Sequence, residues 1–252
     1  MARVELQPLP PEEAIAFFRA KHALRSFDWG DLWQAEHAAA FTVAKSVGFD
    51  ILTDIRGAVD AAIADGSTLR DFRQRLEPTL RKKGWWGRQE VIDPVTGEAR
   101  QATLGTPRRL QAIFRANVRT AYAAGQWERI ERAKAARPYL MYVTAGDERV
   151  RDQHRQWDGI VLPVDDPWWQ THRPPNGWGC RCGVVQLSQR ELERRGLQAG
   201  EAPPVATRGR SNPRSGVVEQ EPGGSEPGWA YNPGVAPGAQ LGRVLADKIA
   251  AM

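Results

Sequence analysis

A loop of prolines and glycines that leads directly to both cysteines places the strongest constraint on this fold. Residues 173–179 read RPPNGWG, and Cys180 and Cys182 follow in a Cys-Arg-Cys triplet. Proline fixes φ and removes a backbone donor, while glycine favours turns, so a helix cannot pass through this segment. The sequence therefore predicts a tightly turned loop that presents two thiols to the elements around it.

The segments around this loop predict a small module of helix and sheet. Three apolar, partly β-branched stretches predict strands: residues 140–144, 160–164 and 183–187. Between the first two, Asp147 is placed to cap a short helix on which Val150, His154 and Trp157 share one face. This arrangement predicts an α+β unit with the cysteine loop at its edge.

The cysteines and histidines raise the question of a metal. Structural zinc sites use four nitrogen or sulfur ligands, and Cys180, Cys182, His154 and His172 supply that number. The spacing argues against zinc, because common sites place ligand pairs two to four residues apart. Two other interpretations stay open. The cysteines can be buried as small apolar residues with His154 packed beneath Trp157, or they can form a strained disulfide, which a reducing cytoplasm disfavours. No other cofactor is expected.

The first 83 residues predict a helical region. Four segments carry apolar residues at helical spacing: residues 12–23, 31–47, 50–64 and 68–83. Residues 84–105 then predict a β-hairpin around the turn sequence at 93–98, with Trp85 and Trp86 as its packing surface. The functional alternative is that this hairpin projects from the molecule and contacts a partner protein.

A long basic helix is predicted to begin at Thr106, with Pro107 in its first position. Residues 106–137 hold eight basic and two acidic residues, and the whole chain has a net charge of +5. Such a face can follow DNA phosphates, bind an acidic protein surface or simply face solvent. The candidate phosphate contacts are Arg108, Arg109, Arg115 and Arg129. A structural interpretation of Arg119-Thr120 also stays open, in which Arg119 reaches an acid such as Asp147.

The last part of the chain, residues 191–252, predicts an extended arm. Ser188 and Gly196 delimit a short helix before it, and residues 198–227 are rich in proline, glycine and serine, which leaves too little apolar surface for independent order. The aromatic stretch at 229–234 predicts an anchor that docks on the module or on another subunit. A short helix is expected at 240–251. No leader and no apolar stretch of membrane-spanning length is apparent, so we expect an unexported protein without a membrane partner.

Several of these motifs together resemble one family. The residues that carry the resemblance lie between 106 and 190: Arg119, Thr120, Asp147, Arg149, Arg151, His154, Asp158, Gly159, Pro174, Pro175, Cys180 and Cys182. The pattern is similar to that of the phage Mu protein F family of minor head proteins, which includes the SPP1 gp7-like group. Two positions depart from it. Many relatives carry Cys-x-x-Cys at 151–154 and a histidine near Gly177, so the resemblance alone predicts no metal site here.

The resemblance implies an α+β structural protein of the virion that acts in head morphogenesis and is not an enzyme. Its expected partners are the portal protein, the major capsid protein and double-stranded DNA. Its expected location is the capsid interior or portal vertex, reached from the host cytoplasm during assembly. Two other functions remain open: a metal-assisted phosphodiester hydrolase that uses His154 and nearby carboxylates, and a non-specific DNA-binding protein.

Overall fold

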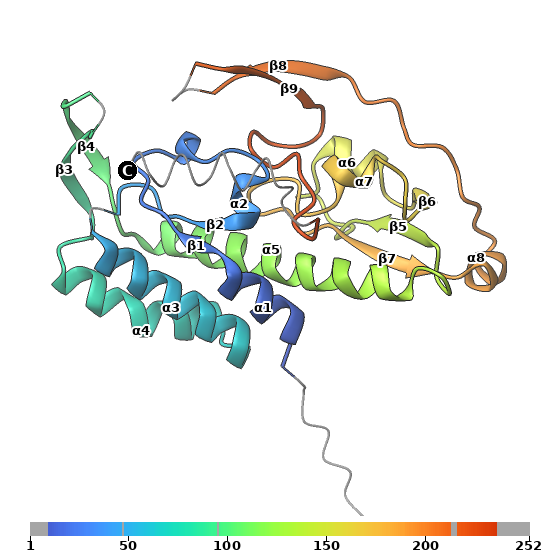
Figure 1. Cartoon of the computed structure of the whole chain (residues 1–252), viewed down its shortest axis with the longest axis horizontal. Coiled ribbons are helices and arrows are strands. Elements are labelled where there is room, and N and C mark those ends of the chain that lie inside the picture. The colour runs from blue at the N-terminus through green and yellow to red at the C-terminus, as the bar shows by residue number, and fades with distance from the viewer. Residues whose placement is uncertain (1–9, 47, 95, 213–215, 236–252) are drawn as a thin grey trace, which may run out of the picture.

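The computed structural model describes residues 10–46, 48–94, 96–212 and 216–235, and it confirms an α+β fold (Figure 1). The helices are α1 (Glu12–Ala20), α2 (Glu36–Ala39), α3 (Phe49–Asp65), α4 (Leu69–Lys82), α5 (Pro107–Ala133), α6 (Asp152–Gln156), α7 (Trp169–His172) and α8 (Gln189–Arg195), with a 3-10 turn at Trp29–Asp31. The strands are β1 (His22–Ala23), β2 (Ala40–Phe41), β3 (Arg88–Ile92), β4 (Ala99–Thr103), β5 (Tyr139–Val143), β6 (Val161–Pro163), β7 (Gly183–Leu187), β8 (Thr207–Ser211) and β9 (Val218–Pro222).

The long helix α5 connects the two halves of the structure. Thr106 caps it by accepting a hydrogen bond from the amide of Arg109, and Pro107 follows, as predicted. The first half of α5 packs against α3 and α4, α1 lies against its middle at Gly125, and its second half lies against the three-stranded sheet (Figure 1). Every described helix falls short of the length and apolar character needed to cross a membrane.

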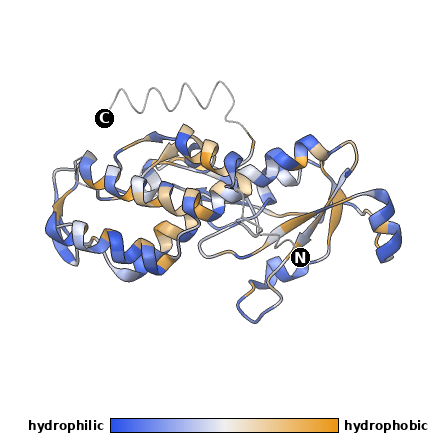
Figure 2. Cartoon of the chain, turned by 90° about the horizontal axis from the view of Figure 1, so that it is seen from below, coloured by the Kyte–Doolittle hydropathy of each residue, from blue (hydrophilic) through white to orange (hydrophobic). Residues whose placement is uncertain are grey.

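Two cores therefore form along one helix. The helical core gathers mainly aliphatic side chains around Leu110 and Ala121 of α5, with members from α1, α3, α4 and the β3–β4 hairpin. The aromatic core gathers around Trp127 and Ile130 of the same helix, and its members are Trp127, Ile130, Leu140, Tyr142, Trp157, Leu162, Val164, Trp168, Trp169 and Val184. In Figure 2 the strands of the second half carry the hydrophobic colour, whereas the helices alternate between hydrophobic and hydrophilic positions.

The module contains the predicted strands in the order β6-β5-β7, all antiparallel. Leu140, the second residue of β5, stands opposite Leu162 on one side and Gln186 on the other. Leu140 and Tyr142 share one face of β5 and are fully buried, because side chains two apart on a strand point the same way. The β3–β4 hairpin is also confirmed, with Trp85 buried and Trp86 half-buried against the helical core.

The predicted helix over residues 31–47 is wrong. The chain there makes a 3-10 turn, the short α2 and then β2, which pairs in parallel with β1. The buried Lys21 donates from Nζ to the carbonyl oxygen of His37 at 2.6 Å, and Phe41 packs edge-on against Phe18 at 5.5 Å. These long-range contacts favour an extended chain over the helix that the alanine-rich pattern indicates.

The predicted extended arm is partly paired. Its strands β8 and β9 pair antiparallel and arch over the molecule (Figure 1). Two contacts tie this pair of strands down: Asn212 donates to the carbonyl oxygen of Gly30 at 3.0 Å, and Gln34 donates to the buried carboxylate of Glu221 at 3.4 Å. The helix expected at 240–251 lies outside the described residues. The division into domains at 83, 105 and 190 stays a prediction.

Candidate functional site

Three side chains meet near the end of the β5–β7 pair, where Val143 stands opposite Gly183. His154 comes from α6, and Cys180 and Cys182 come from the loop that enters β7. Nδ1 of His154 lies 3.9 Å from the sulfur of Cys180 and 3.6 Å from that of Cys182, and all three ligand atoms lie within 4.8 Å of one another. Both cysteines are free thiols. We call these three residues the thiol–imidazole cluster.

The ring of His154 is held firmly in this position. It is 1% exposed and stacks on Trp157 with ring centroids 5.2 Å apart, which confirms the predicted packing. Its Nε2 lies 2.8 Å from the carbonyl oxygen of Gly224. A carbonyl only accepts, so Nε2 carries the proton and Nδ1 turns its lone pair toward the two sulfurs when the ring is neutral.

His172, the fourth predicted metal ligand, lies outside the cluster. Its Nδ1 lies 2.8 Å from the hydroxyl of Thr171, and its Nε2 lies 3.3 Å from the carbonyl oxygen of Gly223. The ring stacks on Trp168 at 4.5 Å, and burial lowers its pKa. The structure thus joins three of the four candidate ligands, and His172 instead packs in the aromatic core.

The two thiols affect each other's titration. The pairing with Cys182 lowers the pKa of Cys180, although burial opposes this. The same pairing with Cys180, together with burial, raises the pKa of Cys182. Arg119 lies close by and donates to the carbonyl oxygen of Cys180 at 2.7 Å. The guanidinium of Arg119 thus places a positive charge beside the cluster.

Most of the charged residues predicted around the cluster make contacts that hold the neighbouring loops in place. The guanidinium of Arg181 pairs with Asp147 through both carboxylate oxygens and lowers the pKa of that carboxyl. Arg119, for which an acid such as Asp147 was one candidate partner, instead donates to the carbonyl oxygen of Cys180. Asp147 also accepts from the amide of Arg149 and shapes a turn ahead of α6, whose own cap is Arg151. Asp158 accepts from the amide of Thr144 at 2.7 Å.

The remaining motif residues close the loops. Gly159 has a φ of +82°, which favours glycine, and its amide donates to the carbonyl oxygen of Tyr142. Pro174 and Pro175 are buried and begin the turn toward the cysteines. Thr120 is buried on α5 and hydrogen-bonds to the side chain of Tyr231. The motif thus builds a scaffold around the cluster.

A segment far along the chain covers the cluster. We call residues 221–235 the strap, which passes between α2 and the module in Figure 1. Gly224 lies against Trp157, and a Cβ added there would approach the indole to 2.0 Å. Glu226 accepts from the amide of Trp178 at 2.6 Å and pairs with Arg151. The predicted aromatic anchor docks on its own chain, since Trp229 contacts Trp178 at 5.2 Å.

The two departures from the family pattern meet at one carboxylate of the strap. Arg151 pairs with Glu226, and a Cβ added at Gly177 would lie 2.8 Å from the same carboxylate group. This link could not be predicted from local sequence, because 75 residues separate Arg151 from Glu226. Gly177 leaves room for the side chain of Glu226, and Arg151 supplies the charge that pairs with its carboxylate. These two residue types were the only local signals of the link.

The candidate phosphate contacts have different surroundings. Arg109 donates to the carbonyl oxygens of Thr103, Leu104 and Ala44, and burial lowers its pKa to about 10, so its guanidinium is engaged within the chain. Arg129 pairs with Glu13 at 2.9 Å. Arg115 faces the side chain of Gln111, and Arg108 is exposed.

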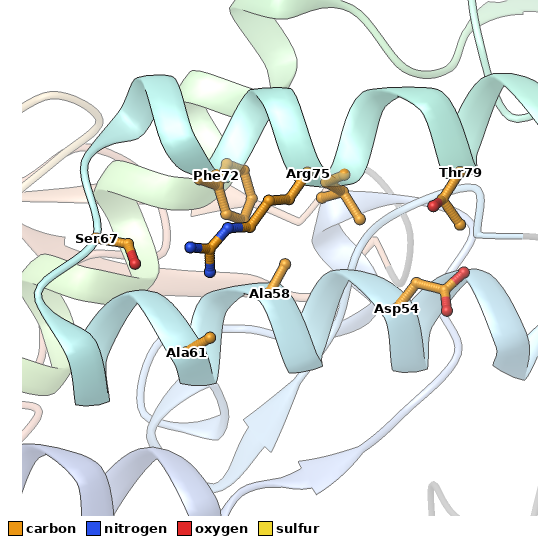
Figure 3. A pocket seen from close by; sticks show the side chains of 8 residues that line it. Asp54, Ala58, Ala61, Ser67, Phe72, Arg75 and Thr79 are labelled. Atoms are coloured by element: carbon orange, nitrogen blue, oxygen red, sulfur yellow. The ribbon is translucent and has the colours of Figure 1, made fainter.

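Two hollows lie elsewhere on the described surface. One, of about 200 Å³, separates α3 from α4, and Figure 3 shows Arg75 lying across it beside Phe72 and Ser67. The other, of about 260 Å³, lies between α5, the β1–β2 region and the strap, with Lys21 and Trp229 in its wall. Neither hollow includes the thiol–imidazole cluster, which is covered rather than open.

Known proteins resemble this chain in sequence. The family model described as "Phage Mu protein F like protein" matches residues 53–185. The chain is 40% identical over 245 residues to "Putative capsid assembly protein F" of Escherichia phage Mu, which covers 90% of this chain and 55% of that protein. It is 39% identical over 173 residues to "Mu-like prophage FluMu F protein" of Haemophilus influenzae, across 69% of this chain and 41% of that one. The chain spans about half the length of these relatives. No solved structure matches it.

Proposed function

We propose that this chain acts in phage head assembly as a structural protein, because it belongs to the phage Mu protein F like family. The observation that carries the proposal is a sequence match to a protein named for capsid assembly. The chain is 40% identical to that protein, and the match covers 90% of the chain. The match includes both halves of α5 and the whole module, so it covers the scaffold as well as the motif.

The finer part of the proposal concerns partners. We assign the chain to the head interior, in contact with the portal protein and the major capsid protein, with double-stranded DNA as a further contact. The two hairpins support protein contacts, because each leaves apolar side chains exposed near its end: Ile92 on β3, and Val217 and Val218 at β9. The arginines of α5 give weaker support for DNA, because Arg109 and Arg129 are engaged within the chain.

A structural role also fits the chemistry of the cluster better than phosphodiester hydrolysis does. Hydrolysis assisted by Mg²⁺ or Mn²⁺ uses carboxylate and other oxygen ligands. The nearby carboxylates of Asp147 and Asp158 are held by Arg181 and by a backbone amide, and the atoms facing His154 are sulfurs. We therefore propose that the chain is not a nuclease.

The test is a prophage whose copy of this gene is deleted and complemented. We expect the deletion to abolish or sharply reduce full heads in electron micrographs, and the tagged protein to co-sediment with the portal and heads in the complemented lysate. Normal heads in the deletion strain, with no co-sedimentation of the tagged protein, would overturn the proposal.

A nuclease assay tests the alternative. Purified protein is incubated with duplex DNA and Mg²⁺ or Mn²⁺, with His154→Ala as the comparison. We expect no cleavage by either protein. Metal-dependent cleavage by the wild type that the variant loses would replace the structural role with an enzymatic one.

A further inference from the structure

We propose that the thiol–imidazole cluster binds one zinc ion through Cys180, Cys182 and His154, with a water molecule as fourth ligand, and that this ion fastens the strap to the module. Two sulfurs and one imidazole nitrogen form a soft donor set of the kind that selects zinc. The inference concerns the protein's own stability and does not depend on the proposed role in heads.

The distances fit a tetrahedral ion. Zinc–sulfur bonds of about 2.3 Å and zinc–nitrogen bonds of about 2.0–2.1 Å place sulfur and nitrogen about 3.6 Å apart at tetrahedral angles. The observed distances from Nδ1 of His154 to the two sulfurs are 3.6 and 3.9 Å. An ion at the centre of the three atoms needs only small movements of the side chains.

The one-residue spacing of the cysteines is also accounted for. Side chains at alternate positions of an extended chain point to the same side, and the residue between them points to the other. Cys180 and Cys182 both face His154, while the guanidinium of Arg181 between them pairs with Asp147. The ion pair with Arg181 thus helps to hold both thiols toward one point.

The surroundings of His154 are those of a metal ligand. A ligating histidine usually donates its other ring N–H to a carbonyl or carboxylate, which fixes its orientation. Here Nε2 donates to Gly224 at 2.8 Å, so the acceptor belongs to the strap. Stacking on Trp157 fixes the plane of the ring. An ion on Nδ1 strengthens Nε2–H as a donor, and binding therefore favours the docked strap.

The first test measures zinc content. The chain is expressed without a polyhistidine tag, purified under reducing conditions and analysed by inductively coupled plasma mass spectrometry. We expect about one zinc per chain, and a loss of about tenfold or more in Cys182→Ser and His154→Asn. His172→Asn is the matched control, because His172 also contacts the strap but not the cluster. It is expected to keep its zinc.

Cobalt uptake keeps the test decisive if a variant fails to fold. Wild-type protein freed of metal is titrated with Co²⁺ under reducing conditions, and we expect thiolate-to-metal charge-transfer bands and the strong visible bands of a tetrahedral site. Wild type that contains no zinc and gives no such bands overturns the inference. A Cys180–Cys182 disulfide in freshly purified protein, or equal zinc loss in His172→Asn, also overturns it.

Hydrogen exchange tests the link to the strap. The amide of Glu226 donates to the carbonyl oxygen of Asn176 at 3.0 Å, and this bond forms only when the strap is docked. We expect this amide to exchange faster after zinc is removed, while amides in α3 keep their rates. Unchanged exchange at Glu226 would show that the ion does not fasten the strap. Neither outcome bears on head assembly, which the prophage deletion tests separately.

Discussion

The two ends of α5 are packed in different ways. Around Leu110 the helical core is built from helices that follow one another closely in sequence, and its side chains are mostly aliphatic. Around Trp127 the aromatic core brings four tryptophans together, and the strap covers it from residues 221–235. The first core is closed by neighbours in sequence, and the second depends on a distant segment. A substitution in the helical core should therefore destabilise the whole fold, whereas one between the strap and the aromatic core should mainly loosen the strap.

The largest effect is expected from Leu110→Ala, in the helical core. Leu110 is fully buried, so its loss leaves a cavity and should lower the free energy of unfolding by about 4 kcal/mol. Urea denaturation followed by tryptophan fluorescence measures the change. Ile92→Ala, at a position 68% exposed, is the control and should change stability little. A loss below about 1 kcal/mol in Leu110→Ala would remove the helical core as the main source of stability.

The next effect is expected from Gly224→Ala, in the strap. The new Cβ would collide with Trp157, and the φ of +91° disfavours any residue with a Cβ. We expect a loss of about 2 kcal/mol, limited because the strap can lift away while the helices remain packed. Hydrogen exchange should therefore increase at Glu226 and not in α3.

Gly146→Ala isolates the backbone part of that cost. Gly146 also has a positive φ, of +68°, but an added Cβ there would meet nothing within 4 Å. It should cost about 1 kcal/mol. If the two alanine variants are equally stable, contact between the strap and Trp157 contributes nothing.

A pH-dependent effect is expected in the helical half. Burial lowers the pKa of Lys21 to about 7, whereas an unfolded lysine titrates near about 10.4. Between these values the unfolded chain binds more protons, so stability should rise with pH by up to about 1.4 kcal/mol per pH unit. Lys21→Met should abolish this rise. Lys82→Met, at an exposed site on α4, should keep it, and equal slopes in both variants would contradict the role of Lys21.

The smallest effect is expected from Glu226→Gln. The change removes the ion pair with Arg151 but keeps an acceptor for the amide of Trp178, so the loss should be about 1 kcal/mol. Glu98→Gln is the matched control, because its pair with Arg100 is exposed and should contribute almost nothing. Thermal unfolding compares the two. An equal change in both would mean that the strap gains no stability from its charge.

Sequence predicted the parts of the molecule whose information is local. The cap and proline at Thr106-Pro107 mark the start of α5, and Ser188 and Gly196 delimit α8, as the structure confirms. Val150, His154 and Trp157 are all buried, as their spacing indicates, although α6 covers only Asp152–Gln156 and the other two residues flank it. Local backbone chemistry and side-chain period were sufficient for these elements.

The sequence could not predict contacts between distant residues. The pattern at 31–47 is helical, but the pairing of β1 with β2 replaces the helix. The charge of Arg109 indicates an outer face, yet three carbonyl oxygens and the ring of Trp85 hold it inside. For the candidate site, the spacing of Cys180 and Cys182 argued against convergence on one point. Only the direction of each side chain, set by the fold, shows that His154 joins them and His172 does not.

The position of the strap in the chain has a consequence during translation. The carbonyl group that His154 contacts is made 70 residues after His154 itself. At about 5–20 residues per second, a nascent chain would wait roughly 4–14 seconds with the indole of Trp157 uncovered. A ribosome that stalls in this interval would leave an aromatic surface open to chaperones or to aggregation, even though the helices made earlier are already complete.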